Sequence, residues 1–174
     1  MIINVHLYII ERQVINMKLW HKDLIPVLPR QQLLGQWREC CCIARNIAVN
    51  GTPNHLLVNK IMDYRITSFE SYCILIIREM QKRGYKISSE AVEKLEDNLF
   101  DWSLQEMKPQ VFRLLSDEPI EHDKLFPDWH NDRYMHQCLM NLQEKFDCEG
   151  IGICEYEKVM EFHHNWFMRK ELEE

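Results

Sequence analysis

Residues 30–49 read RQQLLGQWRECCCIARNIAV, and this stretch predicts the fold class. Its apolar side chains recur at steps of three and four residues, the pattern of an amphipathic α-helix. They are Leu33, Leu34, Trp37, Cys41, Ala44, Ile47 and Ala48. Asn50-Gly51 follows directly, and glycine commonly ends a helix because it adopts the left-handed conformation at little cost. We therefore expect one long helix whose apolar face packs on the core.

The rest of the chain also reads as helical. Thr52-Pro53 predicts a short helix to about Asp63, and the sequence TSFE at 67–70 predicts a capping box for a helix to Arg83. We place that second helix at the core centre, because residues 72–77 are almost continuously apolar. Three further helices are expected, from Ser88 or Ser89 to Phe100, over Arg133–Phe146 behind an Asn131 or Asp132 cap, and over Glu155–Leu172.

Prolines mark the segments that we expect to be irregular. Pro26 and Pro29 predict that Leu19–Leu28 is extended or irregular. Residues 101–129 hold three more prolines and predict loops with a short helix near Gln110–Leu115. The whole pattern predicts an all-α fold, a compact single-domain helical bundle over residues 17–174 with an acidic C-terminal helix.

Composition excludes several classes of protein. The 174 residues can bury one core, and no apolar run approaches 18 residues, so we expect no membrane partner. The seven cysteines are odd in number, three are consecutive, and no CxxC pair occurs. This usage is typical of a reduced, cytoplasmic protein with mostly buried thiols. Ligand spacing around Cys148, Cys154 and His163-His164 is poor for zinc, so we expect no metal and no cofactor.

Charge is distributed unevenly along the chain. The net charge is −6, yet residues 17–60 carry six basic and two acidic side chains, a balance of +4. Residues 146–174 carry three basic and eight acidic side chains, a balance of −5. An anionic partner would therefore meet the N-terminal part of the chain. Ordinary scatter of surface charge is the simpler alternative.

The first sixteen residues, MIINVHLYIIERQVIN, need a separate interpretation. They lack a basic n-region and a small-residue cleavage site, so they make a poor secretory signal. They could form an extra strand or helical turn. They could also be an N-terminal extension upstream of a working start at Met17, and we favour this second interpretation.

The predicted helix at 30–49 also carries a polar row. Gln31, Arg38 and Arg45 follow one another at spacings of seven residues, which places them on one side of the helix. A solvated helix face is the simplest interpretation of such a row. Gly35 points to something more, because glycine inside a helix costs about 1 kcal/mol relative to alanine and usually has a packing or access reason.

The run QLLGQWRE at 32–39 resembles the helix signature of the pyrimidine-dimer DNA glycosylase family, the small phage-type repair enzymes. Residues 79–87, EMQKRGYKI, and 141–145, NLQEK, resemble parts of the family's later helices. The likeness covers most of residues 17–145. It implies an all-α, cytoplasmic, monomeric DNA repair enzyme that acts on damaged double-stranded DNA as a DNA glycosylase, AP lyase and endonuclease.

The resemblance also implies a mechanism and a set of site residues. In this family the N-terminal α-amine attacks the sugar carbon of the damaged nucleotide, and the resulting imine permits β-elimination of the strand. An α-amine with a pKa of about 7.7–8.0 has a sizeable neutral fraction in the cell, unlike an ordinary lysine. The family's catalytic carboxylate falls on Glu39, and a start at Met17 would place the amine there with Lys18 as a neighbouring cation.

Four further positions would contact DNA under this resemblance. Arg38 matches the family's phosphate-binding arginine, and Arg45, Gln32 and Lys145 are further candidates. Two positions depart from the family pattern: Gln32 replaces a histidine, and Cys41-Cys42 stands where an arginine is expected, with Arg45 one turn later.

Two other functions stay open from the sequence alone. The chain could be a non-catalytic nucleic-acid-binding helical module. It could also be a helical interaction protein in which Arg38-Glu39 is only a surface ion pair, worth little energetically.

Overall fold

The computed structural model describes residues 18–117 and 119–172, without the side chains of residues 170 and 171. The described residues form α-helices and short 3₁₀ helices and contain no strand, which confirms the all-α prediction. The α-helices are α2 (Arg30–Asn50), α3 (Ile66–Lys82), α4 (Ser89–Gln105), α5 (Asp132–Asp147) and α6 (Ile153–Glu171). The 3₁₀ helices are η1 (Lys22–Val27), η2 (Asn59–Asp63) and η3 (His122–Lys124).

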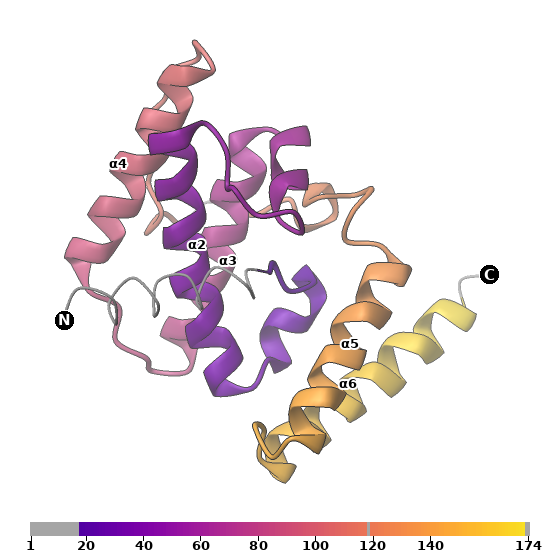
Figure 1. Cartoon of the computed structure of the whole chain (residues 1–174). Helices are drawn as coiled ribbons and strands as arrows, with labels where there is room; N and C mark the ends of the chain where they lie inside the picture. The colour runs from indigo at the N-terminus through magenta and orange to yellow at the C-terminus, as the bar shows by residue number, and fades with distance from the viewer. Residues whose placement is uncertain (1–17, 118, 173–174) are drawn as a thin grey trace, which may run out of the picture.

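Two groups of helices lie on either side of η1 (Figure 1). Helix α2 packs against both α3 and α4, while α5 and α6 form an antiparallel pair. The short helix η1 contacts α3 on one side and α6 on the other, and so joins the two groups. None of the described helices is both long enough and apolar enough to cross a membrane.

Helix α2 ends as the sequence predicts, but its buried face is rotated. Gly51 adopts φ +71° and its N–H bonds to the Ile47 carbonyl, which closes the helix. The buried side chains are Leu33, Gln36, Trp37, Cys40, Ile43, Ala44 and Ile47. Leu34 and Cys41, predicted on the apolar face, are only half-buried. The rotation follows from Gln36, whose polar side chain is fully buried because its amide pairs with backbone groups.

Helix α3 forms the core centre, as predicted. Tyr72, Cys73, Ile76 and Ile77 are almost completely buried within it. The predicted capping box is wrong: α3 begins at Ile66 behind Arg65, so Thr67 lies inside the helix. Burial of Ile66 draws the helix start N-terminal to the predicted cap, since packing of an apolar side chain outweighs one capping bond. Gly84, at φ +73°, follows the helix end as expected.

The segments around the prolines differ from prediction. Leu19–Leu28 contains the 3₁₀ helix η1 with Pro26 inside it, because a short 3₁₀ turn tolerates the ring and the loss of one N–H. Thr52 caps a turn and not a helix: its Oγ1 accepts the Asn54 N–H, and Asn54 has φ +56°. The short helix in this region therefore begins only at Asn59.

The second half of the chain mixes confirmed and corrected predictions. Helix α4 runs to Gln105, beyond the predicted end at Phe100. Residues 110–115 form no helix, and the short helix of this region is η3. Helix α5 starts as predicted, since the Asn131 side chain accepts the Tyr134 N–H at 3.1 Å. Helix α6 covers nearly the predicted range.

All seven cysteines are free thiols, but fewer are buried than predicted. Cys40, Cys73 and Cys138 are buried, and Cys41 is half-buried. The other three, Cys42, Cys148 and Cys154, are exposed. The exposed thiols lie on a solvent-facing turn of α2 and near the α5–α6 connection, where no other element covers them.

One arginine fixes the segment that precedes α2. The Arg83 guanidinium donates to the carbonyls of Leu28 at 2.6 Å, Pro26 at 2.9 Å and Ile25 at 3.2 Å. Its Nε also donates to Glu79 at 2.6 Å. Charge-assisted bonds of this kind are stronger than neutral ones, so the end of α3 holds η1 against the core. This anchoring positions residues 18–21, which begin the candidate site.

Candidate active site

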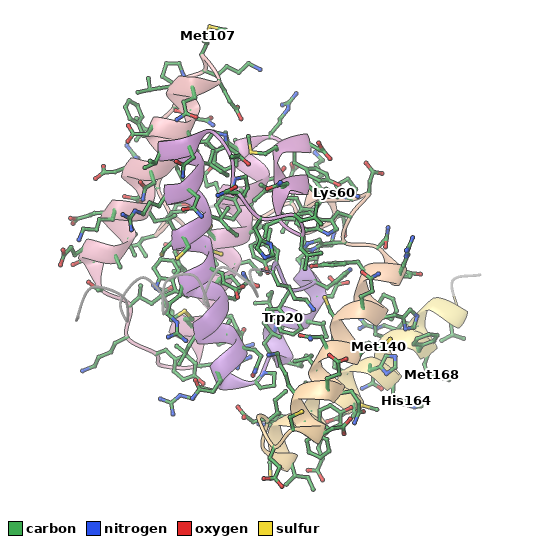
Figure 2. All side chains as sticks on the ribbon, viewed as in Figure 1. Trp20, Lys60, Met107, Met140, His164 and Met168 are labelled. Atoms are coloured by element: carbon green, nitrogen blue, oxygen red, sulfur yellow. The ribbon has the colours of Figure 1, made fainter. Side chains whose placement is uncertain are left out.

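An open pocket of about 760 Å³ lies between α2 and α5. Its floor comes from the segment 18–20, its first wall from α2, and its second wall from α5 and the loop before it. Figure 2 shows Trp20 between the two walls, with Met140 on the α5 side and Lys60 toward one end. The pocket thus joins chain segments more than 100 residues apart, because Lys145 lines it together with Lys18.

A buried amide holds the pocket floor in place. Gln36 Oε1 accepts the Trp20 N–H at 2.8 Å, and Gln36 Nε2 donates to the Lys18 carbonyl at 3.0 Å. The hydroxyl of Tyr72 donates to the Trp20 carbonyl at 2.7 Å, and that of Tyr134 donates to the Leu19 carbonyl. Because each of these bonds is wholly or partly buried, the backbone of residues 18–20 is firmly fixed.

Glu39 faces the start of this fixed segment. The Lys18 backbone N–H donates to Glu39 Oε2 at 3.4 Å. Burial raises the pKa of the Glu39 carboxyl to about 7, although the Lys18 N–H and the charges of Lys18, Lys145 and Arg38 oppose the shift. Near neutral pH the carboxyl therefore exists in both protonation states. Such a group can donate a proton in one step and accept one in the next.

The Lys18 side chain enters the same pocket. Its Nζ lies 4.1 Å from the centroid of the Trp20 indole ring, a cation–π arrangement. Burial lowers the pKa of the Lys18 amine, and the nearby Lys145 lowers it further, while Cys138 and Glu39 raise it. The pocket therefore holds an amine with an increased neutral fraction beside a carboxyl with an increased protonated fraction.

The structure brings together four of the seven predicted site residues. Lys18, Gln32, Glu39 and Lys145 all line the pocket. Arg38 and Arg45 do not line it: both are exposed on the outer side of α2. Met17 lies outside the described residues, as does the predicted extension at 1–16.

Sequence reasoning missed several residues of the pocket. Trp20, Trp129 and Tyr134 contribute aromatic surface, and Lys60 and Arg133 contribute positive charge. An aromatic side chain in a sequence is ordinarily assigned to a core, so nothing local indicated this role. Gln36 did carry a signal, because it is a polar residue within the stripe Leu33–Trp37–Cys40 that turned out to be buried.

A pair of buried histidines lies next to the floor segment, one in the chain and one in space. His21 and His130 are buried with their rings stacked at 5.2 Å, and His130 Nδ1 accepts the Lys22 N–H at 3.0 Å. Burial lowers the pKa of both, and it lowers that of His130 to about 2 with a further contribution from the charge of His21. The His130 ring is therefore neutral at physiological pH. Neither lines the pocket.

The described part of the chain contains no cluster of side chains that could bind a metal ion. No group of three or more His, Cys, Asp or Glu side chains lies close enough together there to hold an ion. The chemistry available in the pocket is that of amines, carboxyl groups and aromatic faces.

Comparison with known proteins adds a family match. Residues 17–92 match the family model of pyrimidine dimer DNA glycosylases. The match confirms the predicted resemblance and includes Lys18, Gln32, Arg38 and Glu39. Lys145 and the whole second wall of the pocket lie beyond it. No curated protein and no solved structure matches the chain significantly.

Proposed function

We propose that this protein is a DNA repair enzyme that excises damaged pyrimidines from double-stranded DNA and then cleaves the abasic strand. One observation carries the proposal: the backbone nitrogen of Lys18 lies 3.4 Å from Glu39 Oε2, both residues line one pocket, and both belong to the segment that matches the glycosylase family. A chain that starts at Met17 would have its α-amine one residue from that nitrogen. The amine would then lie within reach of a carboxyl that titrates near neutral pH.

In the first step the neutral amine attacks the sugar C1′ of the damaged nucleotide. The C1′–N bond to the amine forms as the glycosidic bond breaks, and the proton that the attacking nitrogen loses passes to the departing base. Protonated Glu39 is the proposed source of the proton that opens the sugar ring, and the product is an imine between the amine and C1′.

In the second step the strand is cleaved by β-elimination. The Glu39 carboxylate takes a proton from C2′, the electron pair forms the C2′–C3′ double bond, and the 3′-phosphate leaves. Water then hydrolyses the imine and regenerates the amine. Because imines of this type are electron sinks, the enzyme needs no metal or organic cofactor for either step.

The remaining predicted residues would bind the DNA around the pocket. Arg38 and Arg45 lie exposed on the outer side of α2, where guanidinium groups can contact phosphates without entering the pocket. Lys145 and Gln32 line the pocket and would contact the displaced nucleotide or its phosphate. The target nucleotide would have to rotate out of the duplex, since an enzyme that acts at a glycosidic bond cannot reach its target inside the base stack.

Borohydride trapping tests this proposal. Protein starting at Met17 is mixed with duplex DNA containing one abasic site or one pyrimidine dimer, and borohydride reduces any imine to a stable covalent complex. We expect a trapped complex and strand cleavage, both greatly reduced in Glu39→Gln. Glu90→Gln on the exposed side of α4 is the matched control. Salt-sensitive binding without trapping would overturn the enzymatic proposal in favour of a non-catalytic nucleic-acid-binding module.

A further inference from the structure

We propose that the Lys18 ε-amine is a second nucleophile of this pocket, able to form the imine with sugar C1′ when no α-amine is present there. This inference rests on the proposed function, because it assigns a new reacting group to the same reaction. It concerns the side chain, whereas the α-amine mechanism concerns the chain end.

The placement of Lys18 is the first argument. Its backbone is held on both sides, by its N–H donating to Glu39 and by its carbonyl accepting from Gln36. The side chain therefore starts from a fixed point next to the catalytic carboxyl candidate. Its Nζ lies over the Trp20 indole inside the pocket, so the amine, the carboxyl and an aromatic face share one cavity.

The electrostatic environment is the second argument. Lys18 is half-buried, and burial together with the charge of Lys145 lowers the pKa of its amine. Lysines that act as imine-forming nucleophiles are activated in these two ways, by desolvation and by a neighbouring cation. The Trp20 face holds the ammonium form in position until a proton is removed. Glu39, with its pKa near 7, is a group that can remove it.

The third argument is that this amine belongs to the Lys18 side chain and is therefore present wherever the chain starts upstream of residue 18. A protein whose chain starts upstream of Met17 has no α-amine at residue 17, yet its Lys18 side chain is unchanged. The two amines would thus serve the same carboxyl in differently started forms of the protein. The Lys18 ε-amine would be the nucleophile in the longer form.

The reaction of the ε-amine with an abasic site balances in the following way. The neutral amine adds to the open-chain aldehyde at C1′, and the carbinolamine loses water with a proton from Glu39 to give the imine. The Glu39 carboxylate then takes the C2′ proton and the 3′-phosphate leaves with the C3′–O electron pair. Hydrolysis of the imine returns the free lysine.

The test uses the full chain from Met1 with its α-amine blocked by acetylation, an abasic-site duplex, and borohydride. We expect a covalent complex, and mass spectrometry of the digested complex should place the sugar remnant on the Lys18 side chain. Lys18→Arg should reduce trapping at least 100-fold, because a guanidinium forms no imine. Lys94→Arg on the exposed face of α4 is the matched control.

Three outcomes would overturn the inference, and they separate it from the proposed function. If the blocked chain is not trapped while the Met17-start protein is trapped on its α-amine, the proposed function stands and the Lys18 assignment fails. If the blocked chain is trapped on another lysine, the Lys18 assignment also fails. If no form is trapped, both fail. The mapped position in the unsubstituted protein decides the question even if Lys18→Arg folds poorly.

A pH profile separates a nucleophile from a structural lysine. The trapping rate of the blocked chain should rise with pH to about 7, because neutral amine accumulates, and then level off, because imine formation also uses protonated Glu39. It should decline above the pKa of the Lys18 amine, which burial and the charge of Lys145 lower from the ordinary lysine value of about 10.4. A rate that continues to rise through that value would contradict the assignment.

Discussion

The Lys18–Glu39 pair and the His21–His130 pair each take one residue from the segment 18–21, yet their environments differ. Both pairs are removed from water to a large extent, and in both cases burial is the main cause of the pKa shift. Lys18 and Glu39 line an open pocket. His21 and His130 are enclosed by rings, including those of Tyr72, Phe126 and Tyr134.

The difference teaches that a shifted pKa indicates a reactive group only where a substrate can reach it. His130 is held neutral so strongly that it cannot exchange protons near neutral pH. Glu39 is shifted to about 7 and has access to the pocket, with cations beside it. We therefore propose chemistry for the first pair and packing for the second.

The largest expected effect comes from removing the carboxyl of the first pair. Glu39→Gln should reduce single-turnover strand cleavage by about 100- to 10,000-fold, the usual contribution of a general acid–base group. Affinity for abasic DNA should change little, since a glutamine can keep the bond to the Lys18 N–H. Quenched-flow cleavage assays and fluorescence anisotropy measure the two quantities. A loss below threefold would show that the two pairs do not differ in function.

The second effect concerns acid stability and the histidine pair. Because the pKa of His130 is lowered from 6.5 to about 2, the unfolded chain binds a proton that the folded protein does not. The free energy of unfolding therefore does not depend on His130 above pH 6.5 and falls as the pH decreases below it. At pH 4.5 the loss from this one group is about 2–3 kcal/mol. In His130→Asn, whose amide oxygen can still accept the Lys22 N–H, this acid dependence should be weaker. Urea unfolding between pH 4.5 and 7.5 measures it, and an unchanged slope would contradict the neutral assignment.

Glu39 should give a stability change of opposite sign. Its pKa is raised from 4.5 to about 7, so the folded protein retains a proton that the unfolded chain loses. Its contribution is present below pH 4.5 and is lost as the pH rises through 7. Glu39→Gln should therefore be more stable than the unsubstituted protein by about 1–3 kcal/mol at pH 8 and nearly equal at pH 4. Equal thermal midpoints at both pH values would argue against the raised pKa.

The smallest expected effect belongs to the exposed arginines of α2. Arg38→Ala and Arg45→Ala should each reduce the slope of log affinity against log salt by about 0.9, the value for one phosphate contact with duplex DNA. Cleavage at saturating DNA should change far less than in Glu39→Gln, because neither side chain lines the pocket. Anisotropy titrations at four salt concentrations test this. Unchanged slopes would support the simpler interpretation of a solvated helix face.

Much of the helical fold could be predicted from the sequence, because the signals were local. The repeat of apolar residues predicted α2, Gly51 predicted its end, and Asn131 predicted the start of α5. Local signals failed where packing outweighed them. Ile66 is buried and draws the start of α3 past the predicted cap at Thr67.

The candidate site was less accessible to sequence reasoning. Glu39 and Lys18 came from the family resemblance, and the structure then placed them in contact. Trp129 and Tyr134 could not be predicted as pocket residues, because their segment reaches the pocket through contacts between distant parts of the chain. The hydrogen bond from the Lys22 N–H to His130, which spans 108 positions, is one such contact. Such a contact is set by the docking of α5 and its preceding loop on the first wall and by no local pattern.

The hydrogen bonds of the Gln36 amide have a consequence for where the polypeptide can start. The Gln36 side chain of α2 donates to the Lys18 carbonyl and accepts the Trp20 N–H, so hydrogen bonds join the pocket floor to a helix that follows it in sequence. Both bonds join residues within the described part of the chain. A shift of the initiation codon, or trimming by a peptidase, upstream of Lys18 would therefore leave both partners of each bond in the polypeptide while changing its terminal nitrogen.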